Sequence, residues 1–432
     1  MSEILFIQVG QCGNQIGWKF WERALKEHQN YHKNAPYDLS YRSFFEIGEK
    51  GSFDDLNTVR ARAVLIDSET NVTNQLQKSK IGNIFKGCAF SVDAGGAANN
   101  WAIGYHECGP NQSEPIFERI RKIIERSNKV ESFFMLNSLG GGTGSGFGSY
   151  LLEHLVDLYP KIWKLSSVVT PTGDDSHVVT SPYNCALAAS HLCQYSDCVF
   201  PIENTSLQNF VHGVEKGTSG AFDQMNGVVA NFLMDLTAGS RFHGKMNVDL
   251  LEIKTNLIPF PNHKFLVSGM SPIIATNSPR NINGFFQESM SAKATLCDID
   301  PLKGTVLSSA LLIRGNIGLS TVRSNIDKLA KQINFLPWNK DGWKIGICNN
   351  PPLYSDISIN CLTNTSSICK IFDVMIERFD RLFKSKAYLQ HYTQHMSLEE
   401  MKAVKETILF MKDEYKEMET PIQVPNRPKI IV

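Results

Sequence analysis

The seven residues 140–146 read GGGTGSG, and they follow an apolar stretch, SFFMLN at 132–137, that predicts a buried strand. After them comes a helical stripe of Leu151, Leu155, Leu158 and Ile162. A helix that starts at a glycine-rich turn presents free backbone amides and a partial positive charge, which suit a phosphate. Glycines let the backbone approach phosphate oxygens, and Thr143 and Ser145 add hydroxyl donors. The stretch therefore predicts a phosphate-binding turn.

Strands and helices alternate on both sides of this turn. Four further apolar stretches predict buried strands, at 4–9, 63–67, 165–170 and 197–202. Helical periodicity lies between them, for example at 113–127. This alternation predicts an α/β fold with a parallel sheet covered on both faces. Such sheets bind ligands beyond the carboxyl ends of their strands, where the glycine run is expected to lie.

The rest of the chain is less regular. Residues 28–60 are polar and predict a surface insertion. Between about 203 and 366 helices and strands mix, with strands expected at 265–270 and 305–315. Residues 371–391 and 397–419 predict two helices, and the second opens with a capping box of Ser397 and Glu400. Its stripe, which we interpret as core packing, is Met401, Val404, Ile408, Met411, Tyr415 and Met418.

Composition excludes several classes of protein. Lys plus Arg and Asp plus Glu balance at 43 each, which does not favour a nucleic-acid partner. Ten cysteines form no CxxC pair, so we expect no zinc site and a reducing, cytoplasmic compartment. No apolar run approaches the length of a membrane span, and no secretory signal is expected.

The glycine run matches neither common nucleotide motif. A P-loop requires Lys after the last glycine, where this chain has Phe147. The dinucleotide pattern GxGxxG fails in each register, because Ser145, Phe147 or Ser149 stands at its last position. The alternative is a flexible turn without a ligand. Two further glycine-rich loops, QVGQCGNQIG at 8–17 and DAGGAANN at 93–100, favour a binding site.

Together these segments resemble the tubulin family. The resemblance rests on the two loops and the glycine run, and on NNWAIGYHECG (99–109), SPYN (181–184), NVDLLEIKTNLIPFP (247–261) and FDRLFKSKAYLQHY (379–392). It implies a Rossmann-like GTP-binding domain at 1–202, a mixed α/β intermediate domain at 203–366, and a C-terminal helical hairpin with a tail at 367–432. Within the family, RFHGKMNVDLLEIKTNLIPFP (241–261) and INFLPWNKDGWK (333–344) resemble the epsilon type.

The resemblance also implies a site for GTP or GDP and Mg²⁺. The phosphates and ribose would meet Gln11 and Cys12 and the run Ser138, Gly141, Gly142, Thr143 and Gly144, with Asn99 at the terminal phosphate. The guanine would meet Gln15, Asn204 and Asn226, with Phe222 stacked on its face. Asp67 and Glu69 end a predicted strand and would hold Mg²⁺ through water.

Hydrolysis in this family is completed by a loop of the neighbouring subunit, which corresponds here to about 245–254. We expect Asn247, Asp249 and Glu252 to act on the partner's GTP, with Glu252 polarising the attacking water.

The sequence also departs from the family pattern. Ser181 replaces a Glu near the ribose, Phe222 replaces a Tyr, and the end of the chain, ETPIQVPNRPKIIV, carries no acidic block. We therefore expect a subunit of centrioles or basal bodies that contacts other tubulins and centriolar proteins. A regulatory GTPase switch and an ordinary lattice tubulin remain alternatives.

Overall fold

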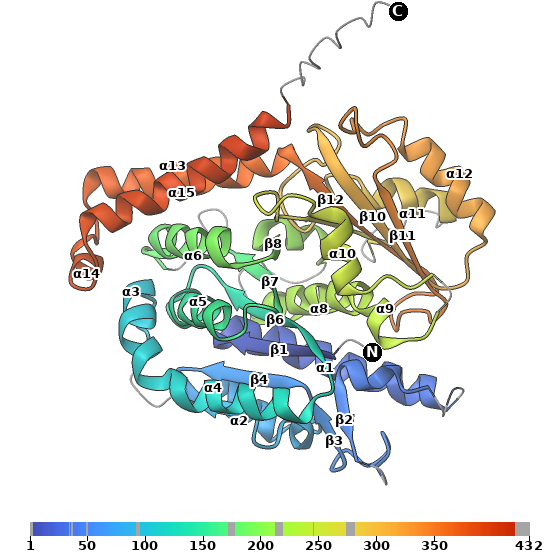
Figure 1. Cartoon of the computed structure of the whole chain (residues 1–432), viewed down its shortest axis with the longest axis horizontal. Coiled ribbons are helices and arrows are strands. Elements are labelled where there is room, and N and C mark those ends of the chain that lie inside the picture. The colour runs from blue at the N-terminus through green and yellow to red at the C-terminus, as the bar shows by residue number, and fades with distance from the viewer. Residues whose placement is uncertain are drawn as a thin grey trace, which may run out of the picture.

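A parallel six-stranded sheet forms the centre of the computed structural model (Figure 1). The structure describes residues 3–33, 35, 38–48, 51–91, 96–171, 178–211, 219–244, 246–273 and 281–419. The strand order is β5 (Ala89–Ser91), β4 (Ala63–Asp67), β1 (Glu3–Val9), β6 (Val130–Ser138), β7 (Trp163–Thr170) and β8 (Cys198–Glu203). All five strands predicted for this region are confirmed. β5 was not predicted, because three residues are too short for a periodic signal.

Helices cover both faces of this sheet, because successive strand side chains point to opposite sides. Phe6 packs on one side with α1 (Gly10–His32) and α8 (Ser219–Leu236), whereas Leu5 packs on the other. The second face is covered by α4 (Gly109–Arg126), α5 (Gly148–Leu158) and α6 (Ser181–Tyr195). The predicted α/β architecture is thus confirmed.

A second, mixed sheet has the order β11 (Trp343–Cys348), β10 (Val306–Arg314), β12 (Ser358–Thr365) and β9 (Val267–Ser271). β10 runs parallel to β11 and antiparallel to β12. Around it lie α10 (Leu250–Leu257), α11 (Ile282–Ser289) and α12 (Leu319–Leu329). The strands expected at 265–270 and 305–315 are confirmed. β12 escaped prediction because its sequence, SINCLTNT, is polar although every residue of it is buried.

The short elements complete the chain. They are β2 (Phe45–Ile47), β3 (Val59–Ala61), α2 (Thr70–Gln77), α3 (Trp101–Ile103), α7 (Asn204–Leu207) and α9 (Ala238–Arg241). Short 3₁₀ turns lie at Ser40–Ser43, Gly82–Phe85, Gln208–Phe210 and Ser366–Ile368, and π-helical turns at Gly104–Cys108 and Thr143–Phe147. No helix in the described part of the chain is both long and apolar enough to span a bilayer.

The C-terminal helices α13 (Cys369–Ser385), α14 (Gln390–Thr393) and α15 (Leu398–Glu417) pack over α6 along one edge of the molecule (Figure 1). The capping box of Ser397 and Glu400 is confirmed. The single helix expected at 371–391 is wrong, because it ends at Ser385 with Lys386 in the left-handed region at φ 53°. The turn buries Tyr392 against α6. The non-acidic tail from 420 onward lies outside the described residues.

The segment 28–60, expected to be a polar surface insertion, has both exposed and buried residues, so it does not lie wholly on the surface. α1 continues to His32, and the segment buries a cluster of aromatic rings. Phe45 and Phe53 each lie 5.5 Å from the ring of His28, and Phe44 lies 5.7 Å from Phe6. In the sequence these few large side chains stand among many polar residues, so the segment looks polar. In the structure they pack the β2–β3 hairpin on the core. The predicted domain limits at 202 and 366 remain predictions.

Candidate functional site

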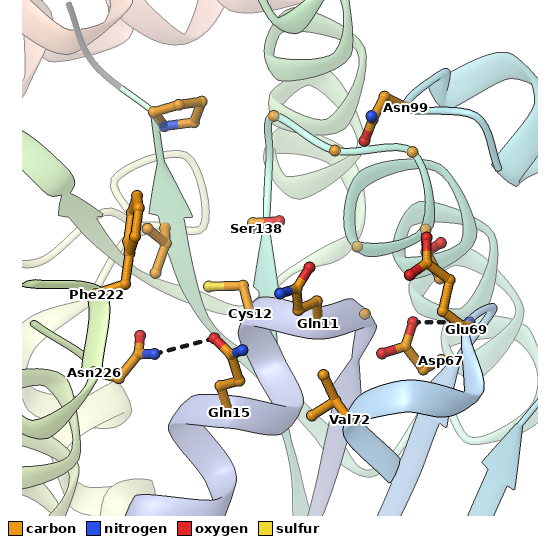
Figure 2. Close-up of a pocket in the computed structure, with 18 of the residues that line it drawn as sticks. Gln11, Cys12, Gln15, Asp67, Glu69, Val72, Asn99, Ser138, Phe222 and Asn226 are labelled. Atoms are coloured by element: carbon orange, nitrogen blue, oxygen red, sulfur yellow. Dashed lines mark hydrogen bonds between the residues drawn. The ribbon is translucent and has the colours of Figure 1, made fainter. Parts of the chain in front are cut away.

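Loops beyond the carboxyl ends of the parallel strands surround one cavity of about 710 Å³ (Figure 2). They follow β1, β4, β5, β6, β7 and β8, and α8 closes the cavity from the side. All fourteen residues expected to bind nucleotide or metal line it: Gln11, Cys12, Gln15, Asp67, Glu69, Asn99, Ser138, Gly141, Gly142, Thr143, Gly144, Asn204, Phe222 and Asn226. The fold therefore brings together residues that lie up to 215 positions apart, the separation of Gln11 and Asn226.

The glycine run is shaped mainly by contacts between loops. A Cβ on Gly142 would lie 2.6 Å from the carbonyl oxygen of Ala97, and one on Gly144 would lie 3.0 Å from that of Ser138. A Cβ on Gly141 would meet nothing closer than 3.8 Å. A side chain at 142 would thus force backbone atoms apart and one at 144 would be tightly crowded, whereas Gly141 leaves space.

The two hydroxyls of the run have different roles. Ser145 is fully buried and donates to the carbonyl oxygen of Gly141, so the expectation that it faces a ligand is wrong. It lies in the π-helical turn that starts α5, where its side chain points back into the turn. Thr143 is half-buried, lines the cavity and shares a hydrogen bond with Ser68.

One end of the cavity offers an aromatic ring and amide side chains. Phe222 and Asn226 project from α8, one helical turn apart, and face the α1 side chains (Figure 2). Asn226 Nδ2 donates to Gln15 Oε1 at 3.2 Å. Phe222 is 40% exposed, a large fraction for an aromatic side chain beside a cavity. A planar ring with amide groups beside it suits a nucleobase.

The opposite end is acidic (Figure 2). Asp67, the last residue of β4, is buried, and burial raises the pKa of its carboxyl to about 6. Its Oδ1 accepts from the backbone amide of Glu69 at 3.3 Å, whereas its buried Oδ2 has no hydrogen-bond partner. A buried carboxylate oxygen without a partner beside an exposed Glu69 fits a hard cation such as Mg²⁺. No group of three His, Cys, Asp or Glu in the described part of the chain offers a complete metal site. Phosphate and water oxygens would supply the other ligands.

The three residues expected to be catalytic lie elsewhere. α10 packs at the amino ends of the strands, where it shares a small pocket with Ile4, Ser132 and Trp163. Asp249 caps this helix, because its Oδ1 accepts from the amide of Glu252 at 2.8 Å.

The side chains of Asn247 and Glu252 have different surroundings. Asn247 Nδ2 donates to the carbonyl oxygen of Phe242, which holds the loop before α10. The Glu252 side chain is 45% exposed and lies 3.5 Å from Lys344 Nζ. Within one chain, the cavity therefore lies at the carboxyl ends of the parallel strands and Glu252 lies near their amino ends.

Comparisons with known proteins agree with this architecture. Residues 3–212 match the family model described as "Tubulin/FtsZ family, GTPase domain", and residues 261–377 match "Tubulin C-terminal domain". The tubulin epsilon chain of Mus musculus is 35% identical over the full length of both chains. The chain belongs to the tubulin family. The tubulin epsilon chain of Homo sapiens is 36% identical, with 93% of this chain and 92% of that one aligned. The tubulin beta-1 chain of Homo sapiens is 30% identical, with 97% and 94% aligned.

Membership of the tubulin family gives the cavity a ligand class, since a GTPase domain implies binding of GTP or GDP. The structure adds lining residues that sequence reasoning missed. Lys19 follows Gln15 by one helical turn and forms an ion pair of 2.8 Å with Asp223 of α8 at the cavity wall. Helical spacing from Gln15 was the available signal. Ser181, which the resemblance placed near the ribose, lines the cavity and is buried.

Replacing Asp67 with Asn is expected to stabilise the protein when it is free of metal and nucleotide. The pKa of about 6 in the folded state exceeds the ordinary value of 3.8, so the folded chain binds more protons than the unfolded chain between these pH values. Well below pH 4 the Asp67 carboxyl is protonated in both states and does not reduce the free energy of unfolding. As the pH rises through 6, the folded chain must bury the charged carboxylate, and the free energy of unfolding falls. At pH 7.5 the loss is about 3 kcal/mol.

Thermal unfolding in the presence of a chelator measures this effect. The midpoint of Asp67→Asn should exceed that of the wild type at pH 7.5, and the difference should shrink towards pH 4. Asp54→Asn, which changes an exposed carboxylate, serves as the control. A difference that does not vary with pH contradicts the prediction.

Proposed function

We propose that this chain is a GTP-binding tubulin subunit of the epsilon type, which contacts other tubulins end to end at centrioles and basal bodies and supports doublet and triplet microtubules. The observation that carries the proposal is that the cavity and α10 lie at opposite ends of the strands of one sheet. The similarity to tubulin epsilon chains over 93% or more of the chain supports the subfamily.

The cavity accounts for the parts of a guanine nucleotide. Asn204, Asn226 and Gln15 supply donors and acceptors for the edge of the base, and Phe222 supplies a stacking face. The turn that starts at Gly141 receives the phosphates at the beginning of a helix.

The metal belongs at the other end of the cavity, where Asp67 and Glu69 would hold Mg²⁺ against the phosphates. A bound Mg²⁺ neutralises negative charge on the phosphate oxygens. It would also offset the cost of burying the Asp67 carboxylate.

Hydrolysis requires a second subunit. β6 alone has nine residues, which span roughly 30 Å at the rise of a strand. No side chain bridges that distance, so Glu252 cannot reach the cavity of its own chain. A head-to-tail contact brings the end of one subunit that carries α10 to the cavity of the next subunit. Repetition of this contact builds a filament. Glu252 would then polarise the attacking water on the partner's GTP.

Replacing Glu252 with Ala is expected to slow GTP hydrolysis in assemblies by about 100-fold, the usual contribution of a general base. Nucleotide binding by the isolated subunit should not change, because Glu252 does not line the cavity. Phosphate release by co-assembled tubulins gives the rate, and a filter assay gives the affinity.

Thr255→Ala is the matched control, since Thr255 is exposed on the same helix. Hydrolysis at the wild-type rate in assembled Glu252→Ala would exclude the role in trans. Asp249→Ala is expected to loosen α10 itself, because it removes the N-cap.

Imaging of a tagged copy tests the proposed localisation in the cell. Confinement to centrioles or basal bodies supports the proposal. A diffuse pool favours a regulatory GTPase, and labelling along all microtubules favours an ordinary lattice subunit. Identification of the nucleotide in the purified protein tests the binding site itself, and the absence of guanine nucleotide would overturn the proposal.

A further inference from the structure

A buried asparagine joins the two loops at the phosphate end of the cavity. Asn184 lies in the first turn of α6 and is fully buried. Its Nδ2 donates to the carbonyl oxygen of Asn99 at 2.8 Å and to that of Gly140 at 2.9 Å. One side chain thus ties the loop that carries Asn99 to the start of the glycine run.

The same side chain also accepts two hydrogen bonds. Asn184 Oδ1 accepts from the backbone amide of Trp101 at 2.8 Å and from the hydroxyl of Tyr392 at 2.6 Å. All four hydrogen-bonding positions of the amide are therefore used. Tyr392 belongs to α14 and is fully buried, so the network continues from the phosphate loops into the connection between α13 and α15.

The loop held by Asn184 has an unusual backbone. Ala98 and Asn99 have φ angles of 45° and 52°, in the left-handed region that L-residues rarely adopt. Two such residues in succession need neighbours that hold them in place. Asn184 and the hydroxyl of Thr180 both donate to the Asn99 carbonyl oxygen, and Asn100 Nδ2 donates to the carbonyl oxygen of His391 at 3.0 Å.

The connection at the other end is also held in an uncommon conformation. Lys386 and Tyr388, between α13 and α14, have φ angles of 53° and 57°. The hydroxyl of Tyr183 donates to the carbonyl oxygen of Ala387 at 3.1 Å. Residues 386–397 are therefore held on α6 by the hydroxyl of Tyr183, and the hydroxyl of Tyr392 joins them to the phosphate loops through Asn184. His391 also accepts directly from Asn100 of one phosphate loop.

We propose that Asn184 is a positioning residue, which sets the geometry of both phosphate loops and transmits occupation of the cavity through Tyr392 to residues 386–397. The inference rests on the proposed function, because it requires a nucleotide in the cavity. A ligand that orders the Asn99 loop strengthens the bonds of Asn184 on one side. The bond to Tyr392 then stabilises α14 on the other side, and the surface of α13 and α15 senses the nucleotide.

The test is hydrogen–deuterium exchange of residues 386–397 with and without a non-hydrolysable GTP analogue, in the wild type and in Tyr392→Phe. Tyr392→Phe keeps the packed ring and removes only the hydroxyl. In the wild type the analogue should slow exchange of this segment several-fold. In Tyr392→Phe the slowing should be clearly smaller, because among the described residues only the Asn100–His391 hydrogen bond still joins this segment to the loop. Affinity for the analogue should fall by about 3- to 10-fold, the effect of one lost buried hydrogen bond.

Tyr183→Phe is the matched control. Tyr183 is also fully buried and bonds to the same connection, but its hydroxyl does not contact Asn184. This variant should exchange faster with and without the analogue and should retain the nucleotide-dependent slowing. A merely structural role for both hydroxyls predicts the same behaviour in the two variants, and that result would overturn the inference.

A further variant tests the two hydrogen bonds that the side-chain amide of Asn184 donates. Asn184→Asp keeps an acceptor for Trp101 and Tyr392 but loses both bonds to the loop carbonyls, so affinity should fall more than 10-fold. The buried carboxylate beside two unpaired carbonyl oxygens should also lower the thermal midpoint without nucleotide. Unchanged affinity in Asn184→Asp would overturn the inference. Failure of the wild type to bind the analogue would instead overturn the proposed function, so the two failures are distinguishable.

Discussion

Replacing Glu27 with Ala is expected to lower the free energy of unfolding by about 3 to 5 kcal/mol, the usual cost of removing one partner from a buried ion pair. The Glu27 side chain in α1 is 2% exposed. Its carboxylate lies 2.7 Å from Arg241 Nη1 and 2.9 Å from Arg314 Nη2. Without it, two guanidinium groups remain buried side by side and lose their shared anion.

The network extends across the fold. Arg314 Nη1 lies 3.2 Å from Asp235, which also accepts a hydrogen bond of 2.6 Å from the hydroxyl of Tyr354. Burial by itself would lower the pKa of Arg314, but Glu27 and Asp235 raise it above its ordinary value. Because these residues come from α1, α8, α9 and β10, the network joins the parallel sheet and its helices to the mixed sheet.

Urea unfolding followed by tryptophan fluorescence measures the loss. Glu22→Ala is the control, since Glu22 is exposed on the same helix and its replacement should change the free energy by less than about 0.5 kcal/mol. Glu27→Gln should lie between the two, because it keeps hydrogen-bonding atoms but not the charge. Equal midpoints for Glu27→Ala and Glu22→Ala would show that the network does not stabilise the fold.

Replacing Gly142 with Ala is expected to weaken guanine-nucleotide binding by about 5- to 150-fold, which corresponds to the 1 to 3 kcal/mol cost of overpacking. The new Cβ would lie 2.6 Å from the carbonyl oxygen of Ala97 and 2.8 Å from the amide nitrogen of Asn100. Both are backbone atoms, so the whole loop that carries Asn99 must move. The phosphate end of the cavity would lose its shape.

Substitutions at two other glycines distinguish distortion of the loop from simple blocking of the phosphate space. Gly141→Ala meets no atom closer than 3.8 Å, so it should leave the thermal midpoint unchanged and weaken binding only by entering the space of the phosphates. Gly284→Ala, in α11, has nothing within 4 Å and should change neither property by much. Calorimetric titration with GDP measures the affinities. Wild-type affinity in Gly142→Ala would contradict the packing role of the glycine run.

Local patterns in the sequence determined the secondary structure of the nucleotide-binding half. The strand at 63–67, the glycine turn after β6 and the capping box at Ser397 all depend on neighbours within a few residues, so their signals are complete in the sequence. The order of the loops, read through the resemblance to tubulins, also named fourteen residues that line one cavity. Their roles toward a nucleotide remain predictions.

The tertiary structure decided what depends on partners far away in the chain. The segment 28–60 looks polar by composition, yet Phe44, Phe45 and Phe53 become core because α1 and the sheet supply surfaces for them. The helix expected at 371–391 stops at Ser385 because burying Tyr392 against α6 outweighs local helical propensity.

The glycine run, too, has a shape that its sequence alone does not reveal. Gly142 and Gly144 lie where backbones come close, and Ser145 turns inward. Asn184 ends the SPYN segment, but that segment does not reveal its packing role, because the role depends on hydrogen-bond partners that lie 44 to 208 positions away in the chain. Sequence patterns predicted which residues line the cavity, whereas packing decided which residues hold its loops, because close contact depends on atoms that only the folded chain brings together.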